Sequence, residues 1–194
     1  MIEILNKITA DSEYVENIKW GKPRKGHIEG TIENHIDELL KNLQYLVDKF
    51  PTEFSEKDIL KLKILIHTHD TFKGKSKRGV SIIDKNSHSS IARRFLSKFT
   101  NDCDLLNMIQ YHDEIYAIFK SLRSGERIIY NVRFTNLINR IKDFRLFSIF
   151  FIIDSCTKGK DISSVCWFLD TVLYTDIKNL INVGNVNEEW IIKK

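Results

Sequence analysis

The sequence predicts an all-α fold, a helical bundle made by a single domain. Only two prolines and eight glycines occur in 194 residues, which favours long helices over many short strands. Apolar residues recur at intervals of three or four along most of the chain, as in amphipathic helices. This length corresponds to one domain at about 100–200 residues per domain. We expect a core over about residues 26–160, followed by a C-terminal helix and tail over 161–194.

The first half of the chain contains two clear helical patterns. The first twenty residues are only weakly helical, but residues 32–50 carry one apolar stripe, which Pro51 is expected to end. Ser55 and Asp58 have the spacing of a capping box, so a second helix is expected from there towards residue 70. Residues 71–87 contain five Lys or Arg together with Gly74 and Gly79. They are expected to form a basic loop.

Helical spacing continues through the second half. It is found over residues 91–99 and again over 105–119, and Gly125 breaks it. A longer apolar helix is expected through residues 137–151. A last helix is expected over 162–177, with Asp161 or Ser163 as its N-cap, before a polar tail that follows residue 184.

Composition and charge exclude several classes of protein. A net charge of +4 permits an anionic ligand without indicating a nucleic-acid surface or a membrane partner. The longest apolar run, residues 146–153, is far shorter than the about 20 residues that a membrane span needs. The three cysteines form no CxxC pair, which favours a reducing compartment over a disulfide framework or a zinc knuckle. We therefore expect a cytoplasmic protein without a secretory signal, and its oligomeric state stays open.

Six ionisable residues share helix faces with apolar neighbours. Buried groups of this kind must be paired or bound to a metal ion. A single inward histidine is more often a hydrogen-bonded core residue, but imidazole and carboxylate together form the ligand set of divalent transition metals. We expect the six to hold one or two ions of Mn, Fe, Ni, Co or Zn. They are His35, His69, Asp70, His88, His112 and Asp154.

These residues lie in segments whose order resembles the HD superfamily, named after its adjacent His-Asp pair. The segments are ENHIDELLKNL, LIHTHDTFKG, NSHSSIARRFL, MIQYHDEIYAIF and FFIIDSCTKG. The resemblance implies an all-α bundle with a central metal site. It implies that His35, His69, Asp70 and Asp154 bind a first ion, and that His88 and His112 bind a second one with Asp70 bridging. Lys73 matches the lysine of the HDxGK pattern, although Phe72 replaces its glycine.

The resemblance also implies a function, a metal-dependent phosphohydrolase that uses metal-activated hydroxide. The expected substrate is a small phosphomonoester or phosphodiester, preferably a nucleotide. Asp70 would orient the nucleophile and Lys73 would contact the phosphate. Further candidates for substrate binding are Arg78, Arg94 and Lys158.

Absent motifs narrow this function and leave two alternatives. The chain lacks the glutamate of 5′-monophosphatases after Asp70, the Glu-Asp pair of alarmone hydrolases, and a GYP tract after His112. A di-iron oxygenase of the HD type would use the same six ligands, because ligand type does not fix the metal. A catalytically silent nucleotide-sensing domain is the other alternative.

Overall fold

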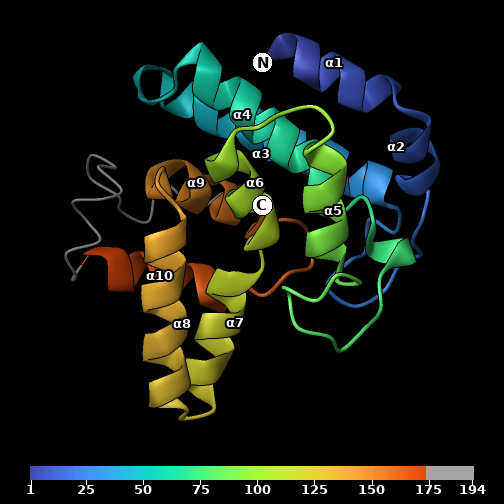
Figure 1. The fold of residues 1–194 in the computed structure, drawn as a ribbon. Coiled ribbons are helices and arrows are strands. Elements are labelled where there is room, and N and C mark those ends of the chain that lie inside the picture. Colours follow the sequence, from blue (N-terminus) through green and yellow to red (C-terminus); the bar gives the residue numbers. More distant parts are fainter. Residues whose placement is uncertain (174–194) are drawn as a thin grey trace.

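A computed structural model describes residues 1–173. Within this range the chain forms ten α-helices and no β-strand, as predicted (Figure 1). The tail after residue 184 and the end of the last expected helix lie outside the described residues. No helix in the described range is both long and apolar enough to cross a membrane.

The first four helices follow the local signals in the sequence. α1 (Ile2–Ala10) and α2 (Ser12–Asn17) precede α3 (Ile32–Lys49), and a 3-10 turn at Pro51–Glu53 separates α3 from α4 (Glu56–Thr68). Pro51 ends α3 as expected. The predicted capping box is confirmed, since the Ser55 hydroxyl accepts from the Asp58 amide while the Asp58 carboxylate accepts from the Ser55 amide.

The remaining helices surround the expected basic loop and the core. After the loop, which contains a 3-10 turn at Lys73–Lys75, come six helices in order. They are α5 (His88–Leu96), α6 (Cys103–Gln110), α7 (Glu114–Arg123), α8 (Arg127–Arg140), α9 (Phe144–Ser155) and α10 (Ser163–Leu173). The Asp161 carboxylate accepts from the backbone amide of Ser163 at the start of α10. α7 and α8 form a hairpin that projects from the body of the bundle (Figure 1).

Two stretches that the spacing predicts as continuous helices are broken. The helical pattern over 105–119 is interrupted at residues 111–113, between α6 and α7. The pattern through 137–151 is interrupted at residues 141–143, where Ile141 is extended and the Asp143 side chain caps α9. Asp104, from α6, holds this second break by accepting from the backbone amides of Lys142 and Asp143. The spacing of apolar residues does not reveal this break, because the break depends on a contact between residues that are far apart in the sequence.

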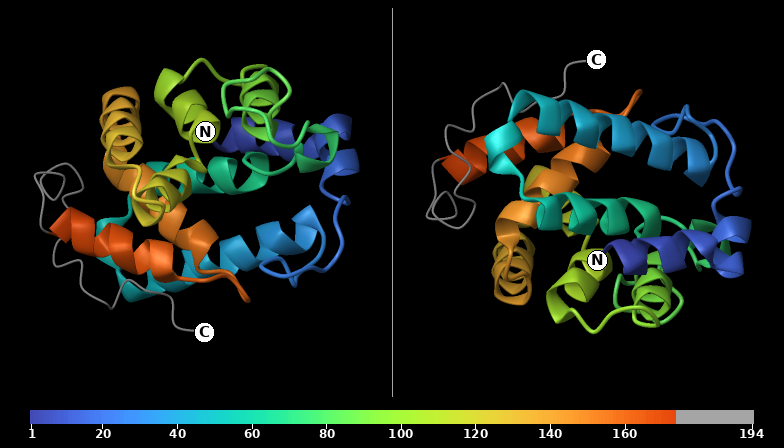
Figure 2. Two further views of the ribbon diagram at one scale, coloured as in Figure 1. Left: turned by 90° about the horizontal axis from the view of Figure 1, so that it is seen from below. Right: turned by 90° about the horizontal axis from the view of Figure 1, so that it is seen from above.

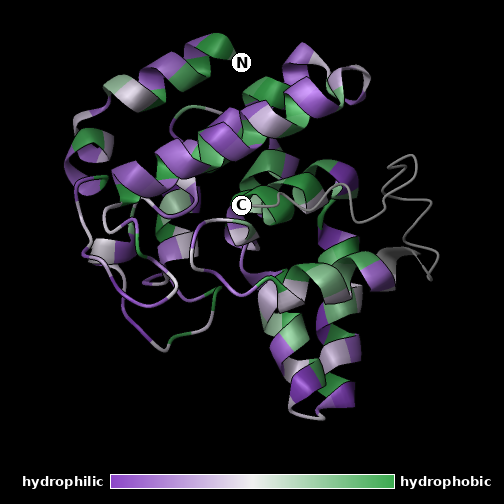
Figure 3. Ribbon diagram, turned by 180° about the vertical axis from the view of Figure 1, so that it is seen from behind, coloured by the Kyte–Doolittle hydropathy of each residue, from purple (hydrophilic) through white to green (hydrophobic). Residues whose placement is uncertain are grey.

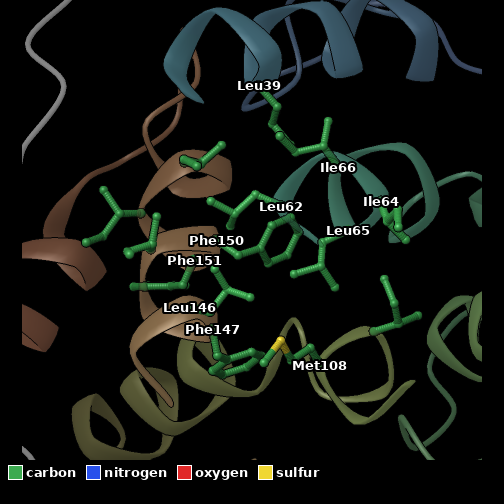
Figure 4. Close-up of a cluster of buried hydrophobic side chains, with 14 of the residues drawn as sticks. Leu39, Leu62, Ile64, Leu65, Ile66, Met108, Leu146, Phe147, Phe150 and Phe151 are labelled. Atoms are coloured by element: carbon green, nitrogen blue, oxygen red, sulfur yellow. The ribbon is translucent and has the colours of Figure 1, made fainter. Parts of the chain in front are cut away.

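The core is centred on α9, which lies between α3 and α4 (Figure 2). Almost every side chain of α9 is buried. In Figure 4, Phe150 lies beside Leu62 and Leu65 of α4, and Phe147 lies beside Met108 of α6. Hydrophilic and hydrophobic residues alternate along the outer helices (Figure 3), as expected for amphipathic helices that cover a core.

Candidate metal centre

The six predicted ligands meet at the centre of the bundle, although fewer of them lie within helices than the spacing suggests. His35 and Asp154 lie within α3 and α9, and His88 is the first residue of α5. The other three lie in turns, directly after α4 or at the break between α6 and α7. These are His69, Asp70 and His112. Four of the six are 0–3% exposed, whereas the His88 and Asp154 side chains are 19% and 17% exposed.

The end of α4 places the His-Asp pair. α4 stops at Thr68, and the carbonyl of Asp70 then accepts from the Lys73 amide in a turn. This turn carries Lys73 back so that its ammonium donates to Asp70 Oδ2. Phe72, which stands where the HDxGK pattern has glycine, fits this turn, because its backbone is not left-handed and its buried ring packs on Phe95 at 4.9 Å between centroids.

Three of the six residues form a first group around Asp154. His35 Nε2 lies 3.0 Å from Asp154 Oδ1, and His69 Nε2 lies 3.8 Å from the same oxygen. The candidate ligand atoms of these three residues all lie within 4.8 Å of one another. This spacing is close enough for one ion to be bound by all three.

Asp70, His88 and His112 form a second group, whose candidate ligand atoms also lie within 4.8 Å of one another. The Nε2 atoms of His88 and His112 lie 3.1 Å apart. Asp70 Oδ1 faces this group, at 3.5 Å from His112 Nε2 and 3.8 Å from His88 Nε2. Its other oxygen, Oδ2, faces the first group, 3.4 Å from His69 Nε2. Asp70 therefore lies between the two groups with one oxygen directed to each.

The donor atoms fit divalent ions. Two atoms at the centre, His69 Nε2 and Asp70 Oδ1, are buried without a hydrogen-bond partner. An unpaired buried polar atom costs about 1–3 kcal/mol, and coordination to a metal would use both. Imidazole nitrogen and carboxylate oxygen are also the donors that Mn, Fe, Co, Ni and Zn accept.

The charges around the cluster keep its carboxylates ionised. Burial alone would raise the pKa of Asp70, but the nearby charges of His69 and Lys73 hold it well below the usual value. Burial also opposes ionisation of Asp154, and there Lys160 and His35 hold the pKa well below the usual value. Both carboxylates are thus in the form that a metal ion requires.

Three residues that sequence reasoning missed also contact the cluster. Asp113 Oδ2 lies 3.1 Å from His88 Nε2, and the available signal was that residues 112–113 form a second His-Asp pair. Lys160 donates to Asp154 Oδ1 at 2.8 Å. Glu29 Oε1 lies 3.2 Å from His35 Nδ1. No spacing pattern pointed to Lys160 or Glu29, because both lie in loops.

Two cavities adjoin the cluster, and Lys73 lines both. The first, which we call the Lys160 cavity, has a volume of about 370 Å³ and is also lined by Lys25, His27 and Asp154. The second, which we call the basic cavity, has a volume of about 440 Å³. Its ionisable lining residues are Arg24, Lys73, Lys77, Arg78, His88 and Asp113.

The predicted substrate-binding cations are only partly brought together. Lys73 and Arg78 line the basic cavity. Arg94 is exposed on α5 and lines neither cavity. Lys158 is also exposed and lines neither, and its backbone amide donates to Glu38. Lys160, two residues further on, is the lysine that contacts the cluster, through Asp154.

Comparisons with family models, with curated proteins and with solved structures found no match to this chain. The functional argument therefore rests on the geometry and chemistry of the site.

Proposed function

We propose that this protein is a metal-dependent hydrolase of phosphate esters, of the HD type, acting on a small substrate such as a nucleotide. The observation that carries the proposal is the position of Asp70, whose two oxygens face two groups of buried ligands beside cavities lined by cations. A divalent ion in such a site lowers the pKa of water towards about 7 and offsets the charge on phosphoryl oxygens.

The two lysines at the cluster support an anionic substrate. Lys73 donates to Asp70, and Lys160 donates to Asp154. Both side chains also line the Lys160 cavity, so a phosphate there would lie within their reach. A charge-assisted hydrogen bond contributes about 1.5–3 kcal/mol, which makes these lysines the main candidates for holding the phosphate.

Other residues of the Lys160 cavity suit the organic part of an ester. Tyr116 and Phe151 line it together with the cations, and the Tyr116 side chain is half-exposed. An aromatic face of this kind packs against a nucleobase or another planar group.

Asp70, held ionised, can accept a hydrogen bond from the attacking water and so orient it.

The proposal is tested by a hydrolysis screen with a matched pair of variants. Nucleotides, cyclic nucleotides and generic phosphate esters are incubated with the protein and added Mn, Co or Ni, and product release is measured. Lys160→Met is expected to lower kcat/KM by about 10- to 150-fold, from loss of one charge-assisted hydrogen bond. Lys158→Met, an exposed lysine outside both cavities, should leave it within about twofold.

Two results would replace this function with another. Two irons per chain with a mixed-valence EPR signal in protein purified without added metal would indicate an oxygenase. Tight binding of a nucleotide without turnover of any compound would indicate a sensing domain.

A further inference from the structure

Glu29 is a buried carboxylate that the proposed reaction does not use. It lies in the loop before α3, and its side chain is only 3% exposed. Its Oε1 atom lies 3.0 Å from Nδ1 of His27 and 3.2 Å from Nδ1 of His35. One carboxylate oxygen therefore faces two imidazole rings, of which the second belongs to the candidate metal centre.

The loop around Glu29 is built to hold this side chain in place. The Glu29 carbonyl accepts from the Asn34 side chain at 2.8 Å, and the Gly30 amide donates to the carbonyl of His27 at 3.3 Å. Gly30 has a φ of +85°, and a Cβ there would lie 3.0 Å from the Pro23 ring. Glycine is thus needed where the chain turns from Glu29 into α3.

The two nitrogens of His35 face opposite sides of its ring. Nδ1 faces Glu29, while Nε2 faces Asp154 Oδ1 at 3.0 Å and Asp70 Oδ2 at 3.8 Å. A neutral imidazole has one N–H donor and one nitrogen with a free lone pair, and the partner of the donor decides which nitrogen is free. In this structure Nδ1 of His35 is buried and forms no hydrogen bond, and Glu29 Oε1 lies 3.2 Å from it. A proton on Nδ1 that is donated to Glu29 would leave Nε2 as the nitrogen that can bind an ion.

We propose that Glu29 is a positioning residue for the metal centre, which accepts a hydrogen bond from Nδ1–H of His35 and so directs Nε2 of that ring at the metal. The inference rests on the metal binding by His35 in the proposed function. By contacting His27 as well, Glu29 also fixes a histidine that lines the Lys160 cavity.

An ion bound by His27, Glu29 and His35 themselves is the competing interpretation, because their donor atoms also lie within 4.8 Å of one another. Such an ion would need Nδ1 of His35 at the same time as the first group needs Nε2. That arrangement requires a fully deprotonated ring. Metal stoichiometry separates the two interpretations, since a third ion would be lost from a Glu29 variant.

The test measures zinc affinity and one proton resonance in three variants of the full chain. Glu29→Ala removes the acceptor, Glu29→Gln keeps an uncharged one, and Glu33→Ala removes an exposed carboxylate from the first turn of α3 as a control. The dissociation constant for zinc is measured by chelator competition. The Nδ1 proton of His35, shifted downfield by its hydrogen bond, is followed by NMR in the zinc-loaded protein.

Glu29→Ala is expected to weaken zinc binding by about 10- to 100-fold, as substitutions of hydrogen-bond partners of metal-binding histidines do. Glu29→Gln should lie between it and the wild type, and Glu33→Ala should change the affinity by less than about twofold. The downfield resonance should be lost in Glu29→Ala and retained in Glu33→Ala. A side chain that only filled space would change the melting temperature without this order of affinities.

If a folded Glu29→Ala variant binds zinc with wild-type affinity, the role of Glu29 is overturned and the proposed function is not. The same holds if the wild type binds a third ion that Glu29→Ala loses. Should Glu29→Ala not fold, wild-type affinity together with an unmoved resonance in Glu29→Gln would overturn it. Wild-type protein that binds no divalent ion would overturn the proposed function and, with it, this inference.

Discussion

Replacing Asp70 with asparagine removes the negative charge that lies between the two groups of ligands. The side chain keeps its size, so the change is mainly electrostatic. Asp70 accepts a hydrogen bond from Lys73, and its oxygens lie 3.4–3.8 Å from the Nε2 atoms of four histidines. The carboxylate is 2% exposed, so little water can replace it.

The expected loss of stability follows from the burial of the ion pair between Asp70 and Lys73. Breaking a buried ion pair by removing one partner costs about 3–5 kcal/mol. The Lys73 side chain is 21% exposed and can regain some hydration, so we expect a value near the lower end, about 3 kcal/mol. For a chain of about 150–250 residues, 1 kcal/mol corresponds to about 2–4 °C. The metal-free variant should therefore melt about 6–12 °C below the wild type at pH 7.

The pH dependence of this difference has a defined sign. Because the pKa of Asp70 is lowered in the folded protein, its stabilising effect is complete above the pKa of an unfolded aspartate, about 4. It is lost as the pH falls further. The wild type and Asp70→Asn should converge in melting temperature under acidic conditions.

The assay is calorimetry of chelator-treated protein, with and without added divalent ion. Metal at about 100 times its dissociation constant stabilises the wild type by about 2.7 kcal/mol, and Asp70→Asn should lose most of this gain. Asp48→Asn, an exposed position on α3, should stay within about 0.5 kcal/mol of the wild type. Equal melting temperatures for Asp70→Asn and wild type, or an unchanged response to metal, would refute the reasoning.

Three further outcomes are expected. In Gly74→Ala the new Cβ would lie 2.7 Å from the Trp20 ring, so the loop that carries Lys73 must shift; tryptophan fluorescence should change and ester hydrolysis should fall, and an unchanged spectrum would contradict this. Phe72→Ala should cost about 3–5 kcal/mol in denaturant unfolding, because the ring is fully buried against Phe95; a loss under 1 kcal/mol would argue against that packing. Burial lowers the pKa of His67 to about 4, so its contribution to stability is lost as the pH falls from about 6.5 towards 4. The melting temperature of His67→Gln should fall less steeply over that range, and parallel curves would disprove it.

Helix positions were predictable where local signals decide them. The stripe that ends before Pro51 and the capping box at Ser55 involve contacts within a few residues, and both appear as predicted. The breaks at residues 111–113 and 141–143 were not predictable, because apolar spacing continues across them. Asp104 stabilises the second break through contacts 38 and 39 residues away, and no window of sequence contains such a pair.

The candidate site also has a part that the sequence predicts and a part that it does not. Helical periodicity predicted that six ionisable residues face the core. The fold brings all six together, although His69, Asp70 and His112 lie in turns outside the helices. The choice among the loop cations needed the tertiary structure, because a loop lysine such as Lys158 or Lys160 has no periodic signal. Only packing decides that Lys160 reaches Asp154 and that Glu29 reaches His35. The sequence by itself determined the all-α fold class and which polar residues are directed inward. The tertiary structure decided how they pair, because His35 and Asp154 are 119 positions apart and meet only when α3 packs on α9.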